Sequence, residues 1–155
     1  MRYIILCLLL VGCSSTENQK ADLVPEPNIV LNGDDTSYWE PTVKVAPVYP
    51  ALMAQRGQMG CVNVSYVITS EGNIANPRVI KAYPESGFEK ASIKAVMKFQ
   101  YIPSVNNIDR VPIRTNNLFT YTIDTGFGSK KMEDINVFLH EKCQVDLTSL
   151  LKGTH

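Results

Sequence analysis

Between residues 47 and 103 the apolar positions keep two different periods in succession. Apolar and polar residues alternate along 61–70, which is the period of a β-strand. A turn at 71–73 and a second apolar run at 74–82 predict a hairpin with its return strand. Because Pro77 donates no ladder hydrogen bond, we expect this return strand at a sheet edge or with a bulge. The face of the first strand predicted to enter the core carries Val62, Val64, Tyr66 and Ile68.

From residue 88 the period becomes that of an α-helix running to residue 99. Ser86, followed three residues later by Glu89, predicts a capping box at its start. We interpret its lysines as a solvated face rather than a docking patch, namely Lys90, Lys94 and Lys98. The apolar stripe expected to cover the sheet consists of Phe88, Ala91, Ser92, Ala95, Val96 and Phe99.

Two further elements flank this pattern. Pro50 suits the first turn of a short helix over 51–56, which Gly57 ends. A third strand is predicted over 111–123, where both faces carry apolar residues and the orientation stays open.

The N-terminus has the pattern of a secretory leader. Arg2 and a short apolar run precede Cys13, and the run is too short for a bilayer, which needs about 20 residues. Residues 10–13 resemble the lipobox of bacterial lipoproteins, which implies that Cys13 is acylated, palmitate being the expected type of chain. Ser14 resembles the signal for release to the outer membrane. An ordinary signal peptide cut near Cys13, leaving a soluble periplasmic protein, stays open.

The expected organisation has four parts. They are a signal peptide at 1–12, a lipidated N-terminus with a flexible tether at 13–42, a folded domain at 43–124 and a C-terminal extension at 125–155. Trp39 is interpreted as the edge of the fold rather than a sticky contact.

Two cysteines remain once the leader and the lipidated position are set aside. In an oxidising compartment Cys61 and Cys143 are expected to form a disulfide, with two buried free thiols as the alternative. Ile135, Leu139 and Cys143 recur every four residues and predict a C-terminal helix that docks on the domain. The disulfide would pin this helix to the sheet face opposite Val62.

Charge and residue types argue against several functions. With 15 basic and 15 acidic residues the chain is neutral, so we expect no nucleic-acid partner. His140 and His155 are too few for a catalytic set, and the cysteines lack metal-ligand spacing. We therefore expect no enzyme, cofactor or metal, and a small hydrolase using Ser92 or Cys143 is the weakest interpretation.

The ordered set of motifs resembles the C-terminal domain of TonB-type energy transducers over roughly residues 45–124. Residues 47–50 look like the family's P-x-Y-P motif, 57–60 like its G-x-x-G, and 60–68 like its G-x-V-x-V-x-F-x-I strand. The helix at 88–96 matches in its Phe and Ala positions, and 99–103 matches W-x-F-x-P with Phe99 and Tyr101 in the aromatic places.

This resemblance implies an α+β fold, in which a three-stranded antiparallel sheet is packed against a short first helix and a longer second helix. It also implies recognition without catalysis. An outer-membrane transporter plug would add a short segment, the TonB box, to the free edge of the third strand. Tyr49 would assist, with packing beneath the first helix as the alternative. The implied peptide-binding residues are Tyr49, Pro50, Leu118, Phe119, Thr120, Tyr121, Thr122 and Ile123, with Pro47 beside them.

Departures from the family limit what the resemblance implies. Ala46 stands where well-known transducers have Gln, and the chain shows neither their His-bearing membrane helix nor their long Pro-rich spacer. Energy transduction by this chain alone is therefore not expected. We expect an outer-membrane lipoprotein facing the periplasm, and a structural adaptor for another envelope protein or peptidoglycan is the alternative function. A homodimer, coupling to a motor, and shielding of the sheet edge by the C-terminal extension stay open.

Overall fold

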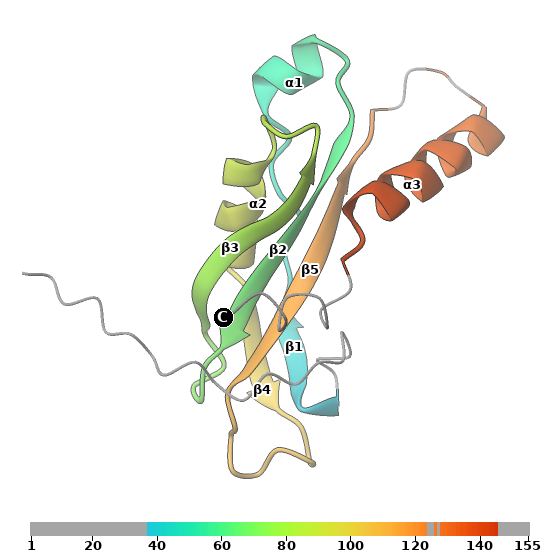
Figure 1. The fold of residues 1–155 in the computed structure, drawn as a ribbon. Coiled ribbons are helices and arrows are strands. Elements are labelled where there is room, and N and C mark those ends of the chain that lie inside the picture. Colours follow the sequence, from blue (N-terminus) through green and yellow to red (C-terminus); the bar gives the residue numbers. More distant parts are fainter. Residues whose placement is uncertain (1–36, 124–125, 127, 146–155) are drawn as a thin grey trace, which may run out of the picture.

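The computed structural model describes residues 37–123, 126 and 128–145 (Figure 1). The predicted leader, Cys13, most of the tether and the last ten residues lie outside this range. Along the chain the elements are β1 (Trp39–Val43), α1 (Ala51–Gln55), β2 (Gly60–Ile68), β3 (Ile74–Tyr83), α2 (Glu89–Val96), β4 (Gln100–Pro103), β5 (Ile113–Tyr121) and α3 (Ser129–Cys143).

The main sheet has three antiparallel strands in the order β3-β2-β5, which confirms the expected fold class. β2 is the central strand and is buried along its whole length. Its alternation is as predicted, since Val62, Val64, Tyr66 and Ile68 join the main hydrophobic core beneath α2. The opposite face meets α3, so the sheet lies between two helical layers (Figure 1).

Pro77 lies on an edge strand and also in a stretch where the strand pairing is irregular. Both settings predicted for this proline, a sheet edge and a bulge, are therefore present. β3 has only β2 as a neighbour, and their register shifts between Ser65 and Val67. Asn76, directly before the proline, has a positive φ of 48°. The backbone row on the outer side of β3 is therefore interrupted.

A second, two-stranded sheet formed by β1 and β4 was not predicted. β1 begins at Trp39, inside the segment that the sequence analysis interpreted as tether. Trp39 is 0% exposed and its indole Nε1 donates a hydrogen bond of 3.0 Å to the carbonyl of Val111. Trp39 is thus a core residue on β1 rather than a residue at the edge of the fold, and the folded part starts before Val43.

The second helix keeps its predicted stripe but not its predicted cap. Phe88, Ser92, Ala95, Val96 and Phe99 are all buried. The helix itself spans Glu89–Val96 with Phe88 as N-cap, and no side chain caps it, so the capping-box prediction is wrong.

The reason lies in the turn before the helix. Gly87 has a φ of +122°, which turns the chain between Ser86 and the first helical turn and leaves Ser86 exposed outside it. The Glu89 carboxylate accepts a 2.8 Å hydrogen bond from the Gly87 N–H instead.

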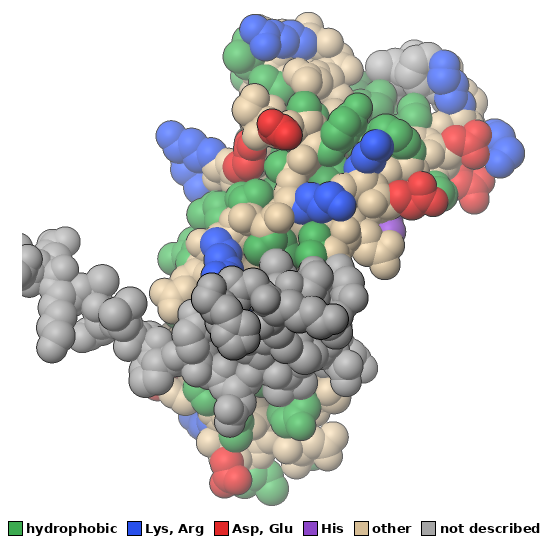
Figure 2. All heavy atoms as spheres, viewed as in Figure 1, with side chains coloured by type: hydrophobic (Ala, Val, Ile, Leu, Met, Phe, Trp, Pro, Cys, Tyr) green, Lys and Arg blue, Asp and Glu red, His purple; other side chains and the backbone are tan. Residues whose placement is uncertain are grey.

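The C-terminal helix α3 docks on the sheet as predicted. Cys61 is joined to Cys143, with an S–S distance of 1.98 Å. Leu139 is buried beside the disulfide, and Asn63 donates a 3.0 Å hydrogen bond from Nδ2 to the Cys143 carbonyl. The outer surface of α3 carries acidic and basic side chains (Figure 2). α3 therefore buttresses the sheet face opposite α2.

Candidate peptide-binding site

Strand β5 is an edge strand with a regular inner register. It pairs with β2 from Gly60 opposite Tyr121 to Ile68 opposite Ile113, without a register shift. Among the residues that the structure describes, no strand pairs with its outer side. An unpaired strand edge presents a row of backbone donors and acceptors to an incoming extended chain.

The side chains of β5 divide between the two faces and settle the orientation that the sequence left open. Phe119 and Tyr121 are 8% and 3% exposed and belong to the main core. Leu118 is half-buried against the apolar cluster of Cys61, Leu139 and Cys143, whereas Thr120 is exposed. Thr122 and Ile123 follow the end of the strand and are half-buried. The strand can therefore offer a peptide its backbone more readily than its side chains.

Tyr49 packs into an aromatic cluster that supports β5. Its ring makes edge contacts with Phe88 and Tyr121, each with centroids 5.6 Å apart. Its hydroxyl donates a 2.6 Å hydrogen bond to the carbonyl of Gln58, just after α1. Burial raises the pKa of Tyr49. Tyr49 thus has a packing role, against Phe88 and Tyr121 rather than beneath the first helix, and a peptide contact by Tyr49 stays a prediction.

Tyr121 is held by polar as well as aromatic contacts. Its hydroxyl and the Ser92 hydroxyl lie 2.7 Å apart, and Ser92 also donates to the Phe88 carbonyl at 3.1 Å. Burial raises the pKa of Tyr121; the bond to Ser92 opposes this, and the Glu89 charge adds to it. These contacts fix one end of β5 against the start of α2.

Gly60 shows why the second glycine of the G-x-x-G motif is needed here. A Cβ at this position would overlap the Tyr83 carbonyl oxygen and the Phe88 ring. The first glycine, Gly57, is needed for another reason, since its φ of +60° lies in the left-handed region. Together they let the chain leave α1 and enter β2 directly beneath the aromatic cluster.

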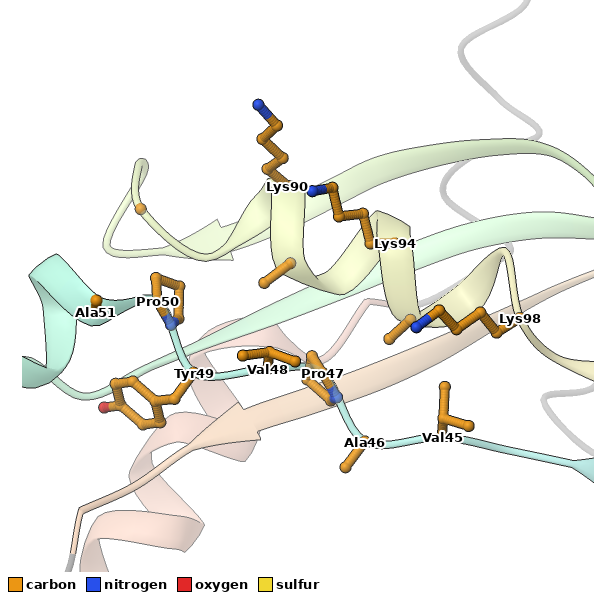
Figure 3. Close-up of a pocket in the computed structure, with 13 residues that line it drawn as sticks. Val45, Ala46, Pro47, Val48, Tyr49, Pro50, Ala51, Lys90, Lys94 and Lys98 are labelled. Atoms are coloured by element: carbon orange, nitrogen blue, oxygen red, sulfur yellow. The ribbon is translucent and has the colours of Figure 1, made fainter.

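Pro47, Tyr49 and Pro50 line a groove, whereas the remaining implied peptide-binding residues lie on β5 or directly after it. This groove has a volume of about 620 Å³ and runs between the extended segment 45–50 and α2 (Figure 3). Tyr49 links the two places, because it lines the groove and also touches Tyr121. The groove is not apparent in the sequence, because its two walls lie far apart along the chain.

The side chains that the hydrolase interpretation needed are both engaged. Ser92 is fully buried and hydrogen-bonded to Tyr121, and Cys143 is in the disulfide. Neither is available as a nucleophile. Within the described ranges, no group of three or more His, Cys, Asp or Glu side chains is placed to hold a metal ion. No helix among the described residues has the length and apolar character needed to cross a membrane.

The fold and the positions of the motifs together define a domain of the TonB C-terminal type. The family described as Gram-negative bacterial TonB protein C-terminal matches residues 45–123, and the chain belongs to this family. The domain of this family is not an enzyme, as the sequence analysis expected.

Two relatives from Pseudomonas aeruginosa are similar to this chain. Its Protein TonB is 30% identical over 98 residues, which are 63% of this chain and 28% of that protein. The solution NMR structure of the P. aeruginosa TonB CTD superposes with a TM-score of 0.51 at 26% identity, covering 65% of this chain and 98% of that one. The family match ends before α3 and begins after β1, so both elements lie outside it.

Proposed function

We propose that this protein faces the periplasm and uses its TonB C-terminal domain to bind a short extended segment of an outer-membrane transporter by strand addition to β5. The observation that carries the proposal is the regular nine-residue strand β5, which among the described residues is paired only on its β2 side. In this mode of recognition main-chain hydrogen bonds supply most of the affinity.

A comparison of the two sheet edges favours β5 over β3. The outer row of β3 is interrupted by Pro77 and by the register shifts against β2, both of which discourage pairing with another chain. β5 has neither a proline nor a register shift. An incoming strand therefore finds a continuous row of backbone groups only on β5.

The packing on both faces of β5 supports the same role. Phe119 and Tyr121 are fixed in the core on one face, and Leu118 packs toward α3 on the other. A strand held in its binding geometry pays less conformational entropy when the peptide pairs with it. α3 thereby stabilises the strand, because it packs on the sheet face rather than adding a strand at the edge.

The proposed placement in the cell rests on the N-terminal sequence. The leader at 1–12 is removed, Cys13 carries the lipid, and residues beyond it tether the domain to the outer membrane. Mass spectrometry of the envelope protein tests this directly. An acylated N-terminal peptide starting at Cys13 is expected, and an unmodified Cys13 would contradict it.

Strand addition is tested by modifying the backbone of the peptide. Substitutions in β5 are unsuitable, because Phe119 and Tyr121 are core residues. A fluorescent peptide copying the N-terminal plug segment of a transporter from the same bacterium is titrated with the protein. We expect saturable binding that is lost when alternate peptide nitrogens are methylated, since methylation removes the donors of the ladder. Unchanged binding of the methylated peptide would refute strand addition. Failure of every plug segment to bind would refute the transporter as partner.

A further inference from the structure

The groove between segment 45–50 and α2 is a second surface suited to an extended chain. Its α2 wall is shallow because the helix contributes the small residues Ala91 and Ala95 to the lining. Its other wall is an extended segment in which Pro47 and Pro50 have no N–H to donate. Tyr49 anchors this wall through its hydrogen bond to Gln58 and its ring contacts with Phe88 and Tyr121.

The backbone of this wall has hydrogen-bonding capacity left over. Ala46 and Val48 point outward and are exposed, whereas Val45, Pro47 and Tyr49 are half-buried, which is the alternation of an extended strand. The N–H groups of Ala46 and Val48 make no hydrogen bond to any described residue. The segment therefore has the form of a strand with backbone donors left over for another chain.

The α2 side of the groove is cationic. Lys90, Lys94 and Lys98 are all exposed and belong to the lining of the groove. In Figure 3 the Lys98 side chain reaches over the groove, whereas Lys90 and Lys94 rise from α2 away from segment 45–50. In the described part of the chain none of them has a salt-bridge or hydrogen-bond partner, and no carboxylate lines the groove. In a chain with equal numbers of acidic and basic residues, this excess of positive charge is local.

The spacing of the lysines matches that of an extended chain. Lys90 and Lys94 lie one turn apart on α2, which separates them by about 6 Å along the helix axis. Lys98 lies two residues past the end of the helix, where its N–H still donates a 3.0 Å hydrogen bond to the Ala95 carbonyl. Alternate residues of a strand are separated by about 6.7 Å. Acidic side chains at every second position of a strand would therefore meet successive lysines.

We propose that this groove binds an extended acidic segment of another protein, in which carboxylates alternate with apolar or small residues. The carboxylates lie against Lys90, Lys94 and Lys98, and the residues between them fill the hollow above Ala91 and Ala95. This site is distinct from the outer edge of β5, although Tyr49 lines the groove and also contacts Tyr121 of β5. The lysine face that the sequence suggested was merely solvated is, on this account, one side of a docking surface.

The probe is a fluorescein-labelled peptide, Glu-Val-Glu-Pro-Glu-Val, titrated against the full chain in neutral detergent micelles. The Lys90→Gln, Lys94→Gln, Lys98→Gln variant removes only exposed charges and is expected to weaken binding about tenfold. Arg78→Gln, Lys130→Gln, Lys131→Gln is the matched control, because these exposed residues lie on β3 and α3 and do not line the groove. It should change the affinity less than about twofold.

Shape is tested apart from charge. Ala91→Phe keeps every lysine but fills the hollow, and it is expected to weaken binding as strongly as the triple variant while the thermal unfolding curve shows an intact fold. Equal losses in the two triple variants, or no effect of Ala91→Phe, would overturn the proposal, since non-specific charge attraction would then explain the binding. A Gln peptide that binds as well as the Glu peptide would do the same.

Two other occupants are distinguished in the same experiment. If the probe binds only after Asp22→Asn and Glu26→Gln, the groove belongs to the chain's own N-terminal segment and the proposal fails. If light scattering shows a dimer that the lysine variant dissociates, the occupant is a second copy and the proposal fails. Methylated plug peptides and the acidic probe report on different sites, so failure of one proposal leaves the other intact.

Discussion

Phe88 and Tyr121 stack with ring centroids 4.3 Å apart, and this contact joins the start of α2 to the end of the proposed peptide-binding strand. Phe88 is fully buried, so Phe88→Ala leaves a cavity between the two elements. We expect a loss of about 3–5 kcal/mol in the free energy of unfolding, measured by urea denaturation. Phe138→Ala, at an exposed position on α3, serves as the control and should cost far less. Similar losses at the two positions would contradict the assigned packing.

The hydroxyl of Tyr121 is predicted to matter less than its ring. Tyr121→Phe keeps the stacking on Phe88 but removes the 2.7 Å bond to Ser92, whose hydroxyl retains the Phe88 carbonyl as acceptor. The expected loss is about 1 kcal/mol in the free energy of unfolding. A loss as large as that of Phe88→Ala would show that the hydrogen bond, and not the ring, holds β5 to α2.

Alkaline pH should destabilise the domain through its buried tyrosines. Burial raises the pKa of Tyr121 and of Tyr49, so the folded chain keeps these phenol protons at a pH where the unfolded chain has lost them. This stability is fully present below the unfolded pKa of about 10 and is lost as pH rises through the higher folded pKa. The free energy of unfolding should therefore fall with pH above about 10. Tyr121→Phe should flatten that decline, and an identical slope in both proteins would contradict this cause.

The disulfide between Cys61 and Cys143 is predicted to stabilise the domain through its long loop. The two cysteines are separated by 82 residues, for which the chain-entropy model gives about 4 kcal/mol. Urea denaturation of the Cys61→Ala, Cys143→Ala variant should show a loss of this size, with α3 exchanging its amide protons faster than β2 does. Non-reducing mass spectrometry that finds two free thiols in protein from the envelope would contradict the pairing.

Gly60 and Gly128 offer a matched pair of glycine substitutions. Gly60→Ala places a methyl group against the Tyr83 carbonyl and the Phe88 ring, and overpacking of this kind costs about 1–3 kcal/mol. Gly128 has open space around its Cβ direction and a φ of −58°, so Gly128→Ala should cost under about 1 kcal/mol. Thermal unfolding of the two variants checks the difference. Equal melting temperatures would contradict the close packing at Gly60.

Elements with a sustained period were predictable, and short elements with distant partners were not. The alternation in β2 repeats often enough to identify the face that enters the main core, and the stripe on α2 identifies the buried face of that helix. β1 has one buried residue, Trp39, followed by four exposed ones, and its partner β4 has only four residues. A lone tryptophan beside a polar segment carried the only signal for that sheet.

The candidate site, like the fold, was predictable from the sequence only in part. The strand β5 and its likeness to the family's third strand were visible in the sequence, but the faces of Phe119 and Tyr121 were not, because both sides of the strand carry apolar residues. The capping-box pattern at Ser86 failed because Gly87 turns the chain before the helix begins. Lys90, Lys94 and Lys98 had the pattern of a solvated helix face, and only the tertiary position of segment 45–50 makes that face part of a groove.

The central claim is that an extended peptide adds a strand to β5, and amide hydrogen exchange read residue by residue tests it most directly. On saturation with the transporter plug peptide, the β5 amides that do not pair with β2 should exchange at least about tenfold more slowly, while those of β3 keep their rates. Unchanged exchange along Ile113–Tyr121 with the peptide bound, or protection confined to β3, would contradict the account.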